Sequence, residues 1–253
     1  MPDRLPIVLL HGSANGSYSW GAVREALVAQ GATVRAPDML GYGRSPAPGP
    51  AWNVREEVAH LRGWLDRHVV GPFHLVTHSL GTFFGLHMRL ALGGRVSRLT
   101  LVDPVLVSVL RVPGEEAALG EMDALFQRFM RAMPDHAAAA RVFVEHWSGA
   151  STWTTLGDRA RALITNLAPR LKAEMVACEA DPTRVEELAV DPVPTSILVG
   201  EGTLLAPRAV SRILGQAFGS ETILVPGAGH MIPLTHPAAI VEALSVTPAR
   251  RAS

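Results

Sequence analysis

The sequence of 253 residues lacks the features that mark a secreted, membrane-spanning or nucleic-acid-binding protein. Cys178 is the only cysteine, which excludes an intramolecular disulfide and makes a cysteine-based zinc site unexpected. The 23 basic and 23 acidic residues form no block of one sign, so neither a nucleic-acid-binding face nor a polybasic membrane patch is expected. No apolar run approaches the roughly 20 residues that cross a bilayer.

The apolar run near the start of the chain, LPIVLL at 5–10, is too short for the apolar region and cleavage site of a signal peptide. It stops at His11 and Gly12 and is more typical of a buried strand. We therefore expect a cytoplasmic monomer or homodimer that acts on a small molecule, with no nucleic-acid or membrane partner. The sequence has no Cys/His cluster and no phosphate-binding loop, so no metal and no organic cofactor are expected.

Short apolar runs bounded by turn residues alternate with longer stretches of helical period, as in β-α-β units. The runs do not alternate apolar with polar residues, which is typical of strands covered on both faces in a parallel sheet. We therefore predict an α/β fold with a mostly parallel, doubly wound sheet. The predicted strands are 5–10, 32–36, 72–77, 98–102, 194–199 and 221–225. The predicted helices between them lie near 20–30, 54–69, 80–92, 207–218 and 237–245.

This rhythm is interrupted once, between the predicted strands at 98–102 and 194–199. About 90 residues there contain no convincing strand, so we predict a helical cap over one end of the sheet. The helical stretches run roughly over 115–133, 136–147, 155–176 and 183–189. The predicted organisation is a first part of the core at 1–104, the cap at 105–192 and a second part of the core at 193–253.

Two of the predicted helices have specific end signals. Asn53 followed by Glu56 is a variant of the capping box that begins a helix. Gly31 stands where a glycine is expected just after the end of the helix at 20–30.

The segment HLVTHSLGTFFGLHM at 74–88 places Ser79 where a predicted strand meets an amphipathic helix. A tight strand–serine–helix turn of this kind projects the hydroxyl of a nucleophile. The residues two before and two after such a serine must be small, because strand and helix pass close together there. Gly81 meets this requirement, and Thr77 stands where glycine is usual. A serine that only caps the helix is the alternative interpretation.

Two further segments follow predicted strands. HGSANGSYSW at 11–20 is a His-Gly turn, in which the N–H of Ser13 could form an oxyanion hole with the N–H of Leu80. An ordinary glycine turn is the alternative there. VPGAGHMIP at 225–233 places His230 in a glycine-rich loop, from which an imidazole can act as a general base near neutral pH.

Together with DMLGYGRS at 38–45, these segments resemble the α/β-hydrolase family, in particular its capped branch of esterases, lipases, carbon–carbon bond hydrolases and cofactor-free haloperoxidases. The resemblance covers nearly the whole chain outside the insertion, and it rests on four motifs that follow four predicted strands in the family's order. It implies Ser79 as nucleophile and His230 as base. Epoxide hydrolases and haloalkane dehalogenases of this family carry aspartate where Ser79 stands, so their chemistry is not expected.

The acid of the implied triad has two candidate positions. The family most often carries it after the penultimate strand, in a loop of the form G-x-x-D, but this chain has Thr203 there. A threonine hydroxyl cannot offset the charge of an imidazolium. Asp103 ends the strand after the nucleophile, a position that some capped members use, and we predict it as the acid. Glu201, two residues before Thr203, is the alternative, followed by an acid of the cap or no acid at all.

The predicted activity is hydrolysis of a small to medium, largely apolar carboxylic ester, lactone or thioester through an acyl-serine. A mostly apolar cleft favours such substrates, and Trp147, Trp153 and Met231 are the candidate pocket residues. One alternative is a carbon–carbon bond hydrolase or a perhydrolase of the haloperoxidase type. The turn at 11–20 is similar to that of the carbon–carbon hydrolases, although Met231 stands where many of them have tryptophan. A second alternative, motivated by Thr203, is a ligand-binding homologue with impaired catalysis.

Overall fold

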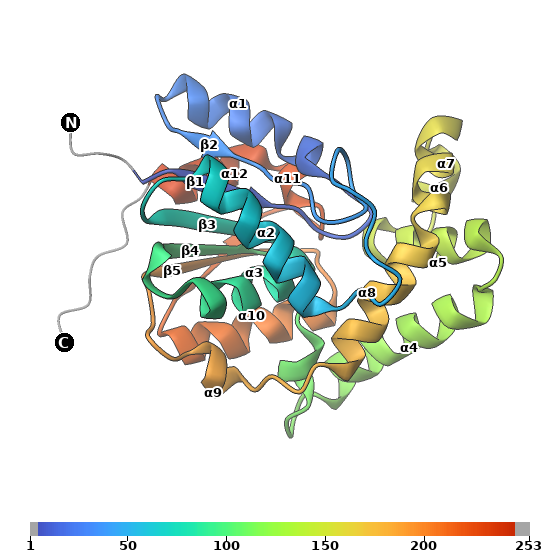
Figure 1. Cartoon of the computed structure of the whole chain (residues 1–253). Helices are drawn as coiled ribbons and strands as arrows, with labels where there is room; N and C mark the ends of the chain where they lie inside the picture. The colour runs from blue at the N-terminus through green and yellow to red at the C-terminus, as the bar shows by residue number, and fades with distance from the viewer. Residues whose placement is uncertain (1–4, 246–253) are drawn as a thin grey trace.

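Six strands form the centre of the structure, a computed structural model that describes residues 5–245 (Figure 1). Their order across the sheet is β2-β1-β3-β4-β5-β6, and all five neighbouring pairs are parallel. The strands are β1 (Ile7–Leu10), β2 (Val34–Arg35), β3 (Phe73–His78), β4 (Val96–Val102), β5 (Thr195–Gly200) and β6 (Thr222–Val225). The predicted parallel sheet is therefore confirmed, with each strand close to its predicted place.

Helices cover both faces of the sheet. Successive side chains of a strand point to opposite faces, so each strand contributes residues to two cores. On one face, Leu9 belongs to a core shared with α1 (Gly21–Ala29) and α12 (Pro237–Ser245). On the other face, Val8 and Leu10 belong to the larger core. The helices of that core are α2 (Val54–His68), α3 (Gly81–Leu92) and α10 (Leu205–Phe218). Burial on both faces explains why the strands read as continuous apolar runs.

The carboxyl ends of the parallel strands lie along one edge of the sheet, where open α/β sheets bind their ligands. Leu10 pairs with Thr77, which in turn pairs with Leu101. The segments that follow β1, β3, β4 and β6 carry, respectively, Ser13, Ser79, Asp103 and His230. The sheet thus brings these four residues, which are far apart in the sequence, to the same edge.

Between β4 and β5 the described chain contains helices and connecting loops but no strand. Apart from short 3-10 turns, these helices are α4 (Glu116–Ala132), α5 (His136–Ser148), α6 (Thr152–Thr155), α7 (Asp158–Asn166), α8 (Ala168–Ala180) and α9 (Val185–Leu188). Figure 1 shows α4 to α8 beyond the carboxyl edge of the sheet. Phe129 of α4, Phe143 of α5 and Leu171 of α8 share a small core of their own. We refer to α4–α9 as the inserted helices.

The helical stretch predicted over 155–176 is helical, but it is divided into two helices, α7 and α8, which meet at Leu167. The short helix α6 precedes them. Pro169 stands in the first turn of α8, where its missing N–H has no partner to lose within the helix. The helix α11 (Ile232–Thr235) was not predicted from the sequence, and it directly follows the loop of His230.

The two predicted helix-end signals are found at their places, one of them in altered form. The side chain of Asn53 accepts hydrogen bonds from the N–H groups of Arg55 and Glu56 at 3.0 and 3.2 Å. The reciprocal half of the capping box is absent, because the carboxylate of Glu56 accepts from the N–H of Gly49 at 2.9 Å. Gly31 has a φ of +80° just beyond the last turn of α1, as predicted.

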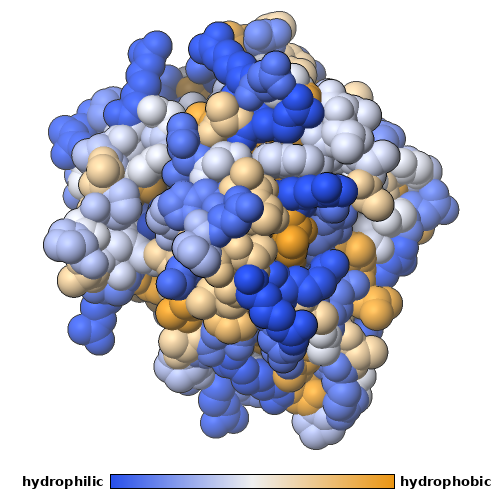
Figure 2. Space-filling view, turned by 90° about the vertical axis from the view of Figure 1, so that its right-hand side faces the viewer, coloured by the Kyte–Doolittle hydropathy of each residue, from blue (hydrophilic) through white to orange (hydrophobic). Residues whose placement is uncertain are grey.

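The face of the molecule formed by the inserted helices is mostly hydrophilic, with smaller hydrophobic areas between charged side chains (Figure 2). This agrees with the inward packing of their phenylalanines. Within residues 5–245, no helix combines the length and apolar character that crossing a membrane requires.

Candidate active site

Ser79 occupies a strained turn between β3 and α3. Its φ is +53°, in the left-handed region that non-glycine residues rarely adopt. The N–H of Ser79 donates to the carbonyl of Val102 at 3.1 Å, which ties the turn to the end of β4. A Cβ at Gly81 would lie 2.5 Å from the carbonyl oxygen of His11. The close approach of strand and helix therefore requires glycine at 81, as the strand–serine–helix interpretation predicts.

The second position near this turn, Thr77, departs from the usual glycine without disturbing the packing. A Cβ at Gly85 of α3 would lie 2.6 Å from the Cγ2 methyl of Thr77, so the methyl occupies space that a helix residue without a side chain leaves free. The hydroxyl of Thr77 shares a hydrogen bond of 2.9 Å with the hydroxyl of Thr82. The extra atoms at position 77 are accommodated by the helix opposite them.

Ser79, His230 and Asp103 form a continuous hydrogen-bonded chain. Nε2 of His230 lies 2.8 Å from Oγ of Ser79, and Nδ1 of His230 lies 2.6 Å from Oδ2 of Asp103. An ionised carboxylate only accepts, so Nδ1 carries the hydrogen and Nε2 presents its lone pair to the serine hydroxyl. All three side chains are buried. This is the arrangement that a general base needs in order to take the proton of a nucleophilic hydroxyl.

Asp103 is held by three donors. Besides His230, the N–H of Gly200 donates to Oδ1 at 2.9 Å and the hydroxyl of Thr203 donates to Oδ2 at 2.6 Å. A Cβ at Gly200 would lie 2.5 Å from the carbonyl oxygen of Gly229, so glycine is required for this approach. Thr203, at the position where the family most often carries the acid, thus donates a hydrogen bond to Asp103, the candidate acid at the neighbouring strand end.

Glu201, the alternative acid, is exposed and lies outside this chain of hydrogen bonds. Its carboxylate accepts from the N–H of Gly227 at 2.9 Å, in the loop that follows β6. Its own carbonyl accepts from the guanidinium of Arg208. The contacts of Glu201 therefore connect the loops after β5 and β6.

Two aromatic residues surround the ring of His230. Nε2 of His78 donates to the carbonyl oxygen of His230 at 2.9 Å, and burial lowers the pKa of His78 to about 3, so this imidazole is neutral. Trp147 of α5 stacks on the His230 ring with centroids 4.3 Å apart. The sequence motifs do not connect His78 with His230. No spacing signal exists for that contact, since 152 residues separate the two histidines.

A small cavity of about 40 Å³ lies above Ser79, between the core and the inserted helices. Besides Ser79, its wall contains three of the predicted residues, Ser13, Leu80 and Trp147, but neither Trp153 nor Met231. Trp153 lies in α6, beyond the end of α5, and Met231 lies at the start of α11. The lining residues are Ser13, Ser79, Leu80, Val105, Val107, Met122, Leu125, Phe126, Phe143, Trp147, Glu174, Met175, Cys178 and Glu179. The wall is predominantly apolar.

The turn after β1 runs directly beside the nucleophile. A Cβ at Gly12 would lie 2.8 Å from the Cβ of Ser79, so the next residue, Ser13, stands at the mouth of the strand–serine–helix turn. Leu80 follows Ser79 and begins α3. The two residues predicted to supply oxyanion N–H groups therefore line the same cavity as the serine hydroxyl.

The cavity also contains a carboxylate that sequence reasoning missed. Glu174 of α8 accepts from the hydroxyl of Ser13 at 2.6 Å, and 161 residues separate them. It also accepts from the hydroxyl of Tyr42 at 2.9 and 3.0 Å. Because Glu174 and its two partners come from three distant segments, no local pattern in the sequence marks this contact. Within residues 5–245, no group of three or more His, Cys, Asp or Glu side chains is arranged to hold a metal ion.

Comparison of the sequence with known protein families agrees with this fold and this arrangement of residues. The profile of the alpha/beta hydrolase family matches residues 7–243, and the chain belongs to this family. The resemblance noted from its motifs is thereby confirmed.

Among curated proteins, the chain is similar to 2-hydroxy-6-oxo-2,4-heptadienoate hydrolase of Pseudomonas putida, with 36% identity over 118 residues that cover 46% of this chain and 43% of that protein. It is also similar to the lipase LipV of Mycobacterium tuberculosis, with 33% identity over 98 residues that cover 39% of this chain and 36% of that protein. The chain thus spans less than half the length of either relative. Both are hydrolases by name.

Among solved structures, the bromoperoxidase from Bacillus anthracis has a TM-score of 0.76 with 20% identity, and the match covers 96% of this chain and 91% of that chain. At 20% identity, this similarity shows only that the two proteins share a fold. It extends over the inserted helices as well as the sheet, because nearly the whole chain is covered.

Proposed function

We propose that the protein is a serine hydrolase that cleaves small to medium, largely apolar carboxylic esters, lactones or thioesters through an acyl-serine. The observation that carries the proposal is the buried chain of hydrogen bonds from Asp103 through His230 to Ser79. Neither metal nor organic cofactor enters this chemistry. The apolar cavity wall supports an apolar acyl or alcohol group.

The reaction would begin when Nε2 of His230 takes the proton of Ser79 and Oγ of Ser79 bonds to the substrate carbonyl carbon. The carbonyl π electrons move to oxygen, and the N–H groups of Ser13 and Leu80 stabilise that oxyanion. Asp103 stabilises the imidazolium. Collapse of the tetrahedral intermediate breaks the bond to the alcohol oxygen, which receives the proton from His230. Water, deprotonated by His230, then attacks the acyl-serine and releases the acid.

Asp103 is the better candidate for the acid than Glu201. The carboxylate of Asp103 lies 2.6 Å from Nδ1 of His230, whereas that of Glu201 accepts from Gly227. The hydrogen bonds from Gly200 and Thr203 hold the Asp103 carboxylate in place. These contacts also weigh against the ligand-binding alternative, which the threonine at 203 had motivated.

A second candidate function is hydrolysis of a carbon–carbon bond. The specific observation that favours it is the similarity to the heptadienoate hydrolase of Pseudomonas putida over 118 residues. A panel of simple esters and of 2-hydroxy-6-oxo-dienoates separates the two reactions. Perhydrolysis is tested in the same panel by adding hydrogen peroxide and an organic acid.

Labelling with a fluorophosphonate probe, followed by intact-mass measurement, tests the proposed function. Wild type is expected to gain one label, and Ser79→Ala none. Asp103→Asn is expected to react about 10³- to 10⁴-fold more slowly, because the wrong tautomer of His230 then faces the serine. Glu201→Gln is the matched control and should react like wild type.

Two other outcomes of the labelling experiment would contradict these assignments. If Glu201→Gln is slow and Asp103→Asn is fast, the acid is Glu201. If wild type gains no label and hydrolyses no member of the panel, the protein is a ligand-binding homologue and the proposal is wrong.

A further inference from the structure

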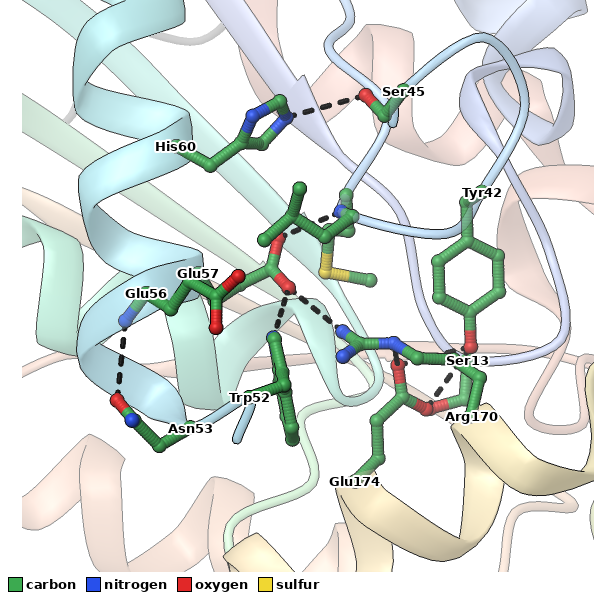
Figure 3. Close-up of polar contacts among 12 residues, drawn as sticks. Ser13, Tyr42, Ser45, Trp52, Asn53, Glu56, Glu57, His60, Arg170 and Glu174 are labelled. Atoms are coloured by element: carbon green, nitrogen blue, oxygen red, sulfur yellow. Dashed lines mark hydrogen bonds and ion pairs between the residues drawn. The ribbon is translucent and has the colours of Figure 1, made fainter. Parts of the chain in front are cut away.

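A buried polar cluster joins the inserted helices to the core beside the candidate nucleophile (Figure 3). On α8, Glu174 accepts from Ser13 and Tyr42, and Arg170 forms ion pairs with Glu174 at 3.1 Å and with Glu57 of α2 at 2.7 Å. The side chains of Arg170, Glu174 and Glu57 are all at least 95% buried. The cluster thus reaches from the helix α2 to the wall of the cavity.

Glu57 and Glu174 each contact three donor groups, and of the two carboxylates only Glu174 lines the cavity. The carboxylate of Glu57 accepts from the N–H of Leu40, the indole of Trp52 and the guanidinium of Arg170. A carboxylate has about four lone-pair sites. The carboxylate of Glu174 is shared by the Ser13 and Tyr42 hydroxyls and the side chain of Arg170, which leaves about one site for a further donor.

The Ser13 hydroxyl adds acceptor capacity at the same place. Its only hydrogen is donated to Glu174, so its oxygen can only accept from any group that enters the cavity. Ser13 and Glu174 both line the cavity of Ser79, whose other wall residues are mostly apolar. The cavity therefore presents hydrogen-bond acceptors at one point of an apolar wall.

The cluster also has a surplus of negative charge. When all its groups are ionised, Arg170 balances only one of the two carboxylates. Burial raises the pKa of the Glu174 carboxyl above its usual value, while Arg170 and the hydroxyls of Ser13 and Tyr42 lower it. A buried carboxylate of this kind gains when a further donor enters, because each added hydrogen bond to a charged acceptor in an apolar site is stabilising.

We propose that Glu174 and the Ser13 hydroxyl determine specificity by binding a hydrogen-bond donor, a hydroxyl or an ammonium, on the carbon α or β to the scissile carbonyl. This inference rests on the proposed function, since it takes the N–H of Ser13 as a donor to the carbonyl oxygen. The hydroxyl of that same residue then lies one short side chain away from the bound carbonyl. A donor on the first or second carbon of the acyl chain reaches it and the adjoining carboxylate.

A purely structural role of Glu174 predicts something different. If the residue only fastens α8 to the core, its replacement lowers the stability of the protein but affects all esters of one length alike. The readout must therefore be a ratio between matched substrates. Stability alone does not distinguish the two roles.

The test compares kcat/KM for methyl hexanoate, methyl 3-hydroxyhexanoate and methyl 3-aminohexanoate in wild type, Glu174→Leu and Glu179→Leu. Glu179 also lines the cavity, but it is half-buried and pairs with Arg111 at its exposed side. In wild type, the hydroxy or the amino ester is expected to be about tenfold to a hundredfold better than methyl hexanoate. In Glu174→Leu the ratio should fall to near one, and in Glu179→Leu it should keep the wild-type value.

The preferred ester identifies the donor as a neutral hydroxyl or as a cation. A wild-type ratio near one, a ratio unchanged in Glu174→Leu, or a ratio lost only in Glu179→Leu would overturn the inference. Binding of the same three esters to Ser79→Ala, with and without Glu174→Leu, is measured by NMR titration and needs no turnover. If none of the three esters is hydrolysed, the binding ratio still decides the role of Glu174, and the labelling experiment decides the proposed function separately.

Discussion

The hydroxyl of Thr203 donates to the carboxylate that lies against His230. Thr203→Val keeps the shape of the side chain and removes this donor. We expect the variant to react with a fluorophosphonate about tenfold more slowly, and to lose roughly 1–3 kcal/mol of unfolding free energy, because a buried carboxylate loses one of its three partners. Labelling rates and urea unfolding measure the two effects.

Thr203→Ser retains the donor and is the matched control, so it should stay near wild type in both measurements. Wild-type behaviour of Thr203→Val would mean that the hydroxyl contributes nothing to the acid.

At the scale of residues, what could be predicted from the sequence depended on local signals. Ser79 and His230 were found because each stands in a short motif after a strand, and Asp103 because Thr203 could not serve. Glu174 was missed. Its partners lie 132 and 161 residues away, and no local pattern encodes such a contact.

The contact between β3 and α3 gives a prediction at the scale of elements. Gly85→Ala would place a Cβ 2.6 Å from the Cγ2 of Thr77. We expect a loss of about 1–3 kcal/mol in unfolding free energy from overpacking. Thr77→Ser removes that methyl and keeps the hydroxyl that pairs with Thr82, so Thr77→Ser combined with Gly85→Ala should recover most of the loss.

The measurement is a double-mutant cycle by urea unfolding. If the two substitutions add without any coupling, the methyl of Thr77 and the vacancy at Gly85 are independent, and the packing argument is wrong.

All six strands and the five helices that cover the sheet could be predicted, because apolar runs and helical periods are local and the flanking turns are marked. The break at Leu167 was missed because apolar residues continue at helical spacing on both sides of it, although Pro169 in the first turn of α8 is a local signal for the start of a new helix. The capping box at Asn53 was predicted as reciprocal, but Glu56 turns to Gly49, which is near only in the folded chain.

For the molecule as a whole, five histidines whose pKa values are lowered by burial predict acid sensitivity. Burial lowers the pKa values of His11 and His146 to about 4 and of His74 and His78 to about 3, from the usual 6.5, and it also lowers the pKa of His87. Below pH 6.5 the unfolded chain therefore binds more protons than the folded one. Stability is fully present above pH 6.5 and falls as the pH decreases toward 3–4, by up to about 1.4 kcal/mol per pH unit for each histidine.

Urea unfolding at several pH values between 7.5 and 4.5 measures this slope. Glu174 acts in the opposite direction, because its pKa is raised, but it is one group against five. His74 bonds to Thr100 away from the site, so His74→Leu should lower the slope by about a fifth to a quarter whatever its effect at neutral pH. An unchanged slope in His74→Leu would show that this imidazole does not titrate as described.

The meeting of Asp103 and Thr203 also bears on how such a site can change over generations. Two neighbouring strand ends reach the same point beside His230, one with a carboxylate and the other with a hydroxyl 2.6 Å away. A carboxylate acquired at 203 would occupy almost the same place as the present one. A lineage could therefore move the proposed acid from one strand to the next by single substitutions, while the proposed nucleophile Ser79 and base His230 stay where they are.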